Sequence, residues 1–349
     1  MRIGFVGCGA IFSHYANVIK VHIPQISITA VCDLDKSKGD SINNASGAKF
    51  YTNIHNMIAG QNLDACFILT PSGLHYEHSK ICLNAGINTF VEKPIALTIE
   101  HALELNKLAK EKNVALGAVY QNRFNKSIQL AKQLIDDAVF GKRVLTSVRL
   151  FWARNNDYYK GWRGTWALDG GVMAQQAIHH LDMLQWLNSP IEKVYCMGKT
   201  LINKLEAEDT AIGTVLFQDG SLGSFQVTTA ARPKDLEASI TILGENGYIE
   251  IGGLALNKIK DINVPDMKMG GKDLIDEHSE SVEKGYGNGH IAYLKNVYES
   301  FVSGKIVAPV SGEDAVDSLK LVQALYMSSE NDLPVQFSNN IKSRRLGVR

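Results

Sequence analysis

Short apolar runs alternate with amphipathic segments over the first 120 residues of the chain. The apolar runs predict strands, and they lack the inside–outside alternation of a half-exposed sheet; they lie at residues 3–6, 28–32, 65–69, 89–91 and 115–119. Strands of this kind are buried on both faces, as in parallel sheets. The intervening segments have helical spacing, near residues 11–20, 35–44, 75–85 and 98–112. Strands that alternate with helices predict a doubly wound parallel sheet.

The pattern changes after about residue 122. A helix predicted at 126–137 leads into an alternating strand at 143–152, and a further helix is predicted near 172–187. Strand segments with turn signals such as Asp219-Gly220 fill residues 191–252 and predict a large, mostly antiparallel sheet with one covered face. Two more helices are predicted at 289–303 and 312–330. We therefore expect an α/β protein with a doubly wound domain over residues 1–121 and a second α/β domain over residues 122–349.

Composition narrows the classes of function. The chain has 349 residues, and its 36 lysines and arginines balance 36 aspartates and glutamates, which argues against a nucleic-acid partner. The five cysteines are scattered and odd in number, which argues against a disulfide framework or a zinc site. No signal-peptide pattern and no apolar stretch of membrane-spanning length are present. We expect a cytoplasmic protein with no membrane partner and no metal.

A glycine-rich turn follows the first predicted strand. Gly7-Cys8-Gly9 stands where backbone amides at the start of a helix can approach a pyrophosphate, although Phe12 occupies the position of the usual third glycine. Asp33 ends the second strand, where a carboxylate accepts hydrogen bonds from ribose hydroxyls and repels a 2′-phosphate. The pattern favours NAD over NADP, while Lys36 and Lys38 keep NADP open.

Several landmarks along the chain coincide with one known family. They are Gly7-x-Gly9 followed by His14, Thr70-Pro71-Ser72 with His75, Glu92-Lys93-Pro94, Gly170-Gly171, and His179 near a helix start. With these landmarks the chain resembles the glucose–fructose oxidoreductase, inositol dehydrogenase and rhizopine-catabolism (MocA) family over nearly its whole length. The resemblance implies a Rossmann domain, an NAD-dependent oxidoreductase acting on the CH–OH group of a small-molecule substrate, and a homo-oligomer, either a dimer or a homotetramer.

A closer resemblance is carried by residues 120–125, 161–171 and 176–182. These segments are similar to the UDP-N-acetyl-2-amino-2-deoxyglucuronate dehydrogenases, which oxidise carbon 3 of a nucleotide sugar in bacterial surface polysaccharide biosynthesis. The alternatives that remain open are a dehydrogenase of a free sugar, inositol or another nucleotide sugar, and a non-catalytic NAD- or sugar-sensing regulator of the same fold.

Oxidation of a secondary alcohol needs a base for the hydroxyl proton and positive charge near the developing oxyanion. Histidine suits the first task, and His179 matches the histidine of the family. Lysine suits the second, and Lys93 stands at the carboxyl end of a parallel strand, where such sheets bind ligands. Many relatives carry Asp four residues before the histidine, whereas this chain has Gln175, which cannot carry a negative charge. The resemblance implies that Lys93, His179 and Gln175 form the catalytic set.

The remaining candidates surround these three residues. The expected cofactor contacts are Gly7, Gly9, Ala10, Ile11, Asp33, Thr70, Pro71, His75, Glu92, Lys93 and Gln121. The expected substrate contacts are Arg123, Arg154, Tyr159, Trp162, Arg163, Gln175, His179 and His290. The aromatic segment 152–166 is either a lid over the substrate, with arginines for a carboxylate or diphosphate, or a loop packed at an interface.

Overall fold

The computed structural model describes residues 1–349 apart from 40–41, 43–45, 265–270, 283–285, 339 and 349. The chain forms two compact units. The first comprises Met1–Tyr120 with His290–Leu319, and the second comprises Gln121–Gly289 with Lys320–Arg349. His290–Leu319 thus groups with the first unit, although the sequence-based division assigns it to the second domain. The domain limits 1–121 and 122–349 stay a prediction.

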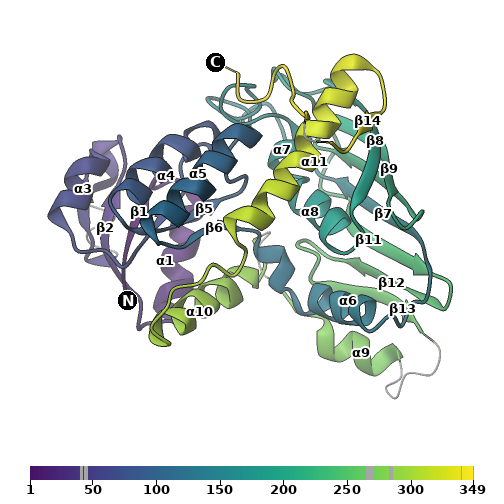
Figure 1. Ribbon diagram of the computed structural model, residues 1–349, viewed down its shortest axis with the longest axis horizontal. Helices are drawn as coiled ribbons and strands as arrows, with labels where there is room; N and C mark the ends of the chain where they lie inside the picture. The colour runs from purple at the N-terminus through teal and green to yellow at the C-terminus, as the bar shows by residue number, and fades with distance from the viewer. Residues whose placement is uncertain (40–41, 43–45, 265–270, 283–285, 339, 349) are drawn as a thin grey trace. The chain divides into compact units, whose positions relative to one another are not determined.

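The first unit is built on a six-stranded parallel sheet with the order β3-β2-β1-β4-β5-β6 (Figure 1). The strands are β1 Arg2–Val6, β2 Ser27–Cys32, β3 Lys49–Tyr51, β4 Ala65–Ile68, β5 Asn88–Glu92 and β6 Leu116–Val119. Strands β4 and β6 are buried along their whole length, which is why their sequences do not alternate. The predicted doubly wound parallel sheet is confirmed.

The described helices of this unit are α1 Ala10–His22, α3 Ile54–Gly60, α4 His75–Asn84, α5 Ile99–Lys112 and α10 Gly289–Val302. Of these, α3 and α5 begin at a side-chain cap. The Thr98 hydroxyl accepts a hydrogen bond from the His101 amide at the start of α5, and Asn113 ends it in the left-handed conformation. Of the helix predicted at 35–44, the structure shows a 3-10 turn at Lys36–Lys38, and most of the rest lies outside the described residues.

The strand order places a topological switch beside β1. Strand β1 pairs with β2 on one side and β4 on the other, so the connections that follow β1 and β4 diverge at the carboxyl edge of the sheet. Open α/β sheets bind their ligands at such a point. The fold therefore provides a dinucleotide site at the β1–α1 turn.

The second unit is built on an eight-stranded sheet with the order β13-β12-β11-β7-β10-β9-β8-β14. The strands are β7 Arg143–Phe151, β8 Ile191–Lys199, β9 Thr210–Phe217, β10 Leu222–Thr228, β11 Glu237–Gly244, β12 Gly247–Gly252, β13 Lys258–Asn263 and β14 Val335–Gln336. Strands β7 and β10 pair in parallel, and every other neighbouring pair in this sheet is antiparallel. The predicted large, mostly antiparallel sheet is confirmed.

Helices cover one face of this second sheet. In Figure 1, α6 Lys126–Asp136, α7 Val172–Gln175 and α8 Ile178–Trp186 lie on the same side of the strands, and α8 packs against β7. Residues of β10 alternate between buried and more exposed positions, as expected for a sheet covered on one side. Helix α9 Gly271–His278 packs against β13. The last helix of the chain is α11 Gly312–Asn331. The single helix predicted near 172–187 is thus divided into α7 and α8.

Candidate functional site

The β1–α1 turn has the geometry of a phosphate-binding loop. Gly7 adopts a φ of +94°, and a β-carbon there would lie 2.8 Å from the Leu69 carbonyl carbon, so only glycine fits. A β-carbon at Gly9 would meet nothing within 4 Å, and Gly9 and Ala10 are exposed with Ile11 partly so. No side chain caps the start of α1, which leaves its amides and its positive dipole end for an anion. The turn fits the pyrophosphate of a dinucleotide.

Asp33 lies one residue beyond β2 and is held in a network of donors. Its carboxylate accepts hydrogen bonds from the backbone amides of Cys8 at 2.8 Å and Asp35 at 2.9 Å, and Lys38 Nζ lies 2.9 Å away. Partial burial alone would raise the pKa of Asp33, but these bonds hold it below its usual value. The carboxylate therefore stays ionised and is tied to the Gly7–Gly9 turn, next to which a ribose is expected.

Lys93 follows β5 and is partly exposed, and its backbone is fixed from the neighbouring loop. His75 is 1% exposed, and its ring nitrogens lie 2.6 Å from the Pro94 carbonyl oxygen and 2.8 Å from that of Thr70. Burial lowers the pKa of His75. The imidazole thus connects the loop after β4, which includes Pro71, to the loop after β5. Its role in the structure is to position the backbone next to Lys93.

A carboxylate whose side chain is 13% exposed directly precedes Lys93. Glu92 Oε1 accepts a hydrogen bond of 2.8 Å from the Tyr15 hydroxyl and lies 3.6 Å from His290 Nε2. His290 is 1% exposed, and the His14 ring packs against it with 4.8 Å between ring centres. Burial alone would raise the pKa of Glu92, but the His290 ring, the Lys93 charge and the Tyr15 hydroxyl hold it below its usual value. A permanent anion therefore accompanies Lys93. Sequence reasoning selected His290 as a substrate contact and missed Tyr15.

Helices α7 and α8 carry two of the candidate catalytic residues at partly exposed positions. Between residues 171 and 180, only Gln175 and His179 are partly exposed, and the others are buried. One ends α7 and the other lies in the first turn of α8, on either side of the turn at residues 176–177. Gln121 Nε2 lies 3.4 Å from His179 Nε2, so the structure brings these two predicted site residues together.

The residue that follows His179 faces inward. His180 is 1% exposed, its nitrogens have no hydrogen-bond partner among the described residues, and burial lowers its pKa to about 4. The His180 ring meets the edge of Trp152, with 6.2 Å between ring centres. His180 is therefore neutral at physiological pH and packed against the sheet.

The aromatic segment after β7 contacts Gln175. Burial raises the pKa of Tyr158, and an interaction with the Gln175 side chain opposes this shift. The Arg163 guanidinium lies 4.6 Å from the centre of the Tyr158 ring. Arg163 also lies over Trp162 at 5.2 Å, and its Nε is buried with no hydrogen-bond partner among the described residues. Sequence reasoning selected Tyr159, whose hydroxyl lies 2.6 Å from that of Thr229, and missed Tyr158. Two adjacent tyrosines gave no signal to distinguish them.

Two other predicted arginines already have acidic partners. Arg123 forms a bidentate ion pair with Asp182, at 2.9 and 2.6 Å, and the two side chains are 7% and 0% exposed. Arg154 Nη1 lies 3.0 Å from Asp235 Oδ1. Of the three candidate arginines, only Arg163 has no carboxylate partner in the part of the chain that the structure describes. The assignments of Arg123 and Arg154 to substrate stay predictions.

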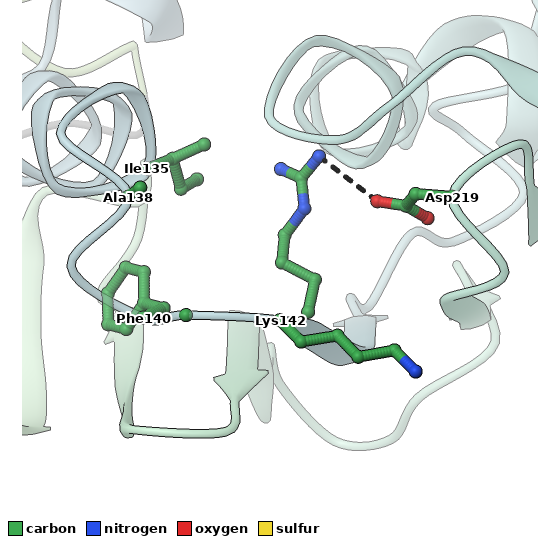
Figure 2. Close-up of a pocket in the computed structure, with 7 residues that line it drawn as sticks. Ile135, Ala138, Phe140, Lys142 and Asp219 are labelled. Atoms are coloured by element: carbon green, nitrogen blue, oxygen red, sulfur yellow. Dashed lines mark hydrogen bonds and ion pairs between the residues drawn. The ribbon is translucent and has the colours of Figure 1, made fainter.

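No predicted site residue lines the pocket of about 290 Å³ shown in Figure 2, which lies at the start of β7. Arg143 and Asp219, which both line it, form an ion pair of 3.5 Å. Among the described residues, no three histidine, cysteine, aspartate or glutamate side chains gather as a metal site would require. In the same part of the chain, no helix is long and apolar enough to cross a membrane.

Comparisons with known proteins agree with this geometry. Residues 1–120 match the NAD-binding Rossmann fold of an oxidoreductase family, and residues 132–337 match the C-terminal alpha/beta domain of that family. The WlbA dehydrogenase from Bordetella pertussis, in complex with NADH and UDP-GlcNAcA, is 35% identical with a TM-score of 0.91, over 96% of this chain and 97% of that one. WlbA from Chromobacterium violaceum, with the same two ligands, is 34% identical with a TM-score of 0.90, over 97% and 96% of the two chains.

Inositol dehydrogenases are also similar to the chain. The myo-inositol 2-dehydrogenase of Thermotoga maritima is 24% identical over 98% of this chain and 100% of that protein. The cofactor is NAD, in agreement with the fit of the β1–α1 turn and Asp33. The chain is an NAD-dependent oxidoreductase and belongs to the sugar dehydrogenases of the GFO/IDH/MocA family.

Proposed function

We propose that this protein oxidises carbon 3 of UDP-GlcNAcA, a UDP-linked N-acetylated uronic acid, in the cytoplasm as a step of surface polysaccharide synthesis. The similarity to two dehydrogenases in complex with this nucleotide sugar supports the substrate, because it extends over nearly all of each chain at 34–35% identity. The inositol dehydrogenase is similar over the same length at a lower identity of 24%.

The main observation behind the proposed substrate is that the Arg163 guanidinium has no acidic partner among the described residues. It stacks on Tyr158, the tyrosine that interacts with Gln175. A buried or half-buried cation without a counter-ion is costly, and an acidic ligand removes that cost. Gln175 also adds no negative charge where many relatives have aspartate, which favours a substrate that is itself acidic.

The side chains divide the chemistry between them. His179 takes the proton of the sugar hydroxyl as general base, and Gln175 hydrogen-bonds the substrate. Lys93, kept beside the Glu92 anion, stabilises the negative charge that develops on the same oxygen. NAD, when bound, accepts the hydride from the sugar carbon.

The first test is NADH formation, followed as absorbance, with UDP-GlcNAcA and with myo-inositol as separate substrates. We expect kcat/KM to be at least about tenfold higher with UDP-GlcNAcA, because the charged contact is worth more than about 1.4 kcal/mol. Activity with myo-inositol alone would refute the nucleotide-sugar substrate and leave the family membership intact. Lack of NAD reduction with a panel of sugars would support a regulatory protein instead.

Arg163→Met is expected to weaken binding of UDP-GlcNAcA about 10–100-fold, because a hydrogen bond to a charged group contributes about 1.5–3 kcal/mol. Isothermal titration with UDP-GlcNAcA and with the uncharged sugar analogue UDP-GlcNAc measures the effect. A loss confined to UDP-GlcNAcA indicates contact with the sugar carboxylate, and an equal loss for both ligands indicates the diphosphate.

The control for this test is Arg149→Met. Arg149 is 51% exposed on β7 and lies 3.7 Å from Glu237, so its replacement should leave both affinities unchanged. If Arg163→Met binds both ligands as tightly as the wild type, Arg163 has no role in recognising the acidic substrate.

We also infer that the uncovered face of the second sheet joins copies of this chain into a dimer or tetramer. Leu243, Leu145, Leu222 and Leu216 stand opposite one another on four adjacent strands, and Leu222 is 54% exposed. A contiguous apolar row on an open sheet is typical of an interface. Sedimentation velocity tests this inference, and a monomer at micromolar concentration would refute it.

A further inference from the structure

The helix start that carries Gln175 has no cap of its own. Helix α7 is only four residues long. Its N-cap residue is Gly171, which has no side chain that could accept a hydrogen bond. The first amides of a helix lack partners within the helix and need acceptors from elsewhere. A segment remote in sequence must therefore supply them.

Glu208, which lies shortly before β9, supplies two of these acceptors. Its backbone carbonyl accepts a hydrogen bond of 2.9 Å from the Val172 amide, and its Oε1 accepts one of 2.9 Å from the Met173 amide. The Tyr326 hydroxyl, on α11, accepts a hydrogen bond of 2.9 Å from the Gly171 amide and donates one of 3.0 Å to Glu208 Oε1. Three successive amides are thus held by two side chains and one carbonyl.

This cap is buried and tightly fitted. Glu208 is 5% exposed and Tyr326 is 2% exposed, so water does not compete for these bonds. Gly171 is the residue that leaves room, because a β-carbon at this position would overlap the Glu208 carbonyl oxygen and carboxylate. The fit makes Glu208 and Tyr326 specific to this helix start.

Backbone hydrogen bonds connect the capped residues to Gln175 and His179. The Gln175 amide donates to the Gly171 carbonyl at 3.0 Å, and the Ala177 amide donates to the Val172 carbonyl at 2.8 Å. The Ala177 carbonyl in turn accepts hydrogen bonds of 2.8 and 2.9 Å from the amides of His180 and Leu181, so the backbone bonds continue from α7 into the first turn of α8, which holds His179. A shift of residues 171–173 therefore moves Gln175 and His179 together.

We propose that Glu208 is a positioning residue that, together with Tyr326, anchors the start of α7 and so sets the positions of Gln175 and His179. The proposal rests on the proposed function in one respect, namely that Gln175 and His179 act on the sugar. It assigns roles to two residues outside the candidate catalytic set.

The charge of Glu208 changes near neutral pH. Burial raises the pKa of Glu208 to about 7, with a further contribution from Asp169, while the bonds from Met173 and Tyr326 oppose the shift. The titratable groups that face Glu208 are Asp169, Tyr326 on α11 and Cys196 on β8. An ionised carboxylate accepts stronger hydrogen bonds than a neutral acid. The cap therefore tightens as the pH rises through about 7.

The test compares Glu208→Ala, Glu208→Gln and Tyr326→Phe with the wild type, using whichever sugar the wild type oxidises. We expect Glu208→Ala to lose about 10²-fold in kcat, since small misplacements of reacting groups cost this much, with the affinity for NAD unchanged. Glu208→Gln keeps an acceptor oxygen without a charge, so it should retain most of the low-pH kcat and show a smaller rise through about pH 7, because only the part of the rise that comes from the general base remains. Tyr326→Phe should lower kcat by about tenfold, because one of three anchors is lost.

Glu206→Ala is the matched control. Glu206 is exposed and accepts a hydrogen bond of 3.1 Å from the Trp166 amide, so it is also a carboxylate bonded to backbone, but it does not contact α7. Its kcat and pH profile should equal those of the wild type. Wild-type kcat in Glu208→Ala, or an unaltered pH profile in Glu208→Gln, would overturn the proposal. If Glu208→Ala does not fold, the other two variants decide.

Hydrogen–deuterium exchange gives a readout that does not depend on activity. The amides of residues 171–173 should exchange faster in Glu208→Gln and Tyr326→Phe than in the wild type and the Glu206→Ala control. Unchanged exchange in both variants would refute the anchoring role. A wild type that oxidises no sugar would refute the proposed function, and the exchange experiment would still decide the cap.

Discussion

The Lys93→Ala variant is expected to lose about 10²–10³-fold in kcat, the usual effect of removing one group that stabilises a developing oxyanion. Affinity for NAD, measured by fluorescence titration, should change little, because the β1–α1 turn and Asp33 are intact in this variant. The effect should be large because the backbone after Lys93 is held at the Pro94 carbonyl and the ammonium charge interacts with the Glu92 carboxylate.

Two features fix Lys93. The His75 ring lies between the carbonyl oxygens of Pro94, at 2.6 Å, and Thr70, at 2.8 Å, and so connects the loop after β5 to the loop after β4. The Glu92 carboxylate, 2.8 Å from the Tyr15 hydroxyl, has a pKa below its usual value, in part because its charge interacts with that of Lys93. Preorganised charge is effective because it does not reorganise during the reaction.

Lys93→Arg and Lys107→Ala are the informative comparisons. Arginine keeps the charge but not the compact ammonium, so we expect partial activity at most. Lys107 is 78% exposed in an ion pair with Glu111, and its loss should leave kcat unchanged. If Lys93→Ala retains kcat within about threefold of the wild type, an oxyanion role for Lys93 is excluded.

Arg123→Met is expected to lower the free energy of unfolding by about 3–5 kcal/mol, because it leaves the buried Asp182 carboxylate without a partner. Both side chains are almost fully buried, and the Arg123 guanidinium also lies 5.0 Å from the centre of the Trp186 ring. Urea denaturation followed by circular dichroism measures the loss.

A double variant separates the ion pair from the cost of breaking it. Arg123→Met combined with Asp182→Leu removes both charges, and it should recover much of the stability. Arg149→Met, in a pair that is 51% and 20% exposed, should cost at most about 1 kcal/mol. A loss below about 1 kcal/mol in Arg123→Met would contradict the stabilising role of this ion pair.

The same variants test the sequence-based role of Arg123. If the arginine serves only the fold, the refolded double variant should bind UDP-GlcNAcA with wild-type affinity. A weaker affinity in the stable double variant would indicate that Arg123 contacts the substrate as well. The measurement therefore distinguishes two roles that the sequence leaves open.

Much of the fold could be predicted because it depends on local patterns. The buried strands of the first unit have continuous apolar sequences, and the strands of the second alternate, so the period of the pattern indicates which faces are covered. Gly7 and Asp33 have a fixed place relative to the first two strands, so the cofactor turn also follows from the sequence. Short strands were not predicted from the sequence, such as β3 with three residues and β14 with two.

Only the tertiary structure decided which charged side chains are neutralised. Arg123 and Asp182 are 59 positions apart, and Arg154 and Asp235 are 81 positions apart, so no local pattern links them. Before folding, these two arginines and Arg163 are equivalent candidates for an acidic ligand. Folding pairs the first two with aspartates and leaves the third without an acidic partner among the described residues.

The hydrogen bonds that surround the candidate catalytic residues could not be predicted from the sequence either. Tyr15 and Glu92 are 77 positions apart, and Gly171 and Tyr326 are 155 positions apart. The sequence by itself determined the two sheets, the cofactor turn and the residue types suited to alcohol oxidation, because these follow from periodicity and from chemistry near one another in the chain. What holds those residues in place is decided by hydrogen bonds between distant segments, which form only when burial brings the segments together.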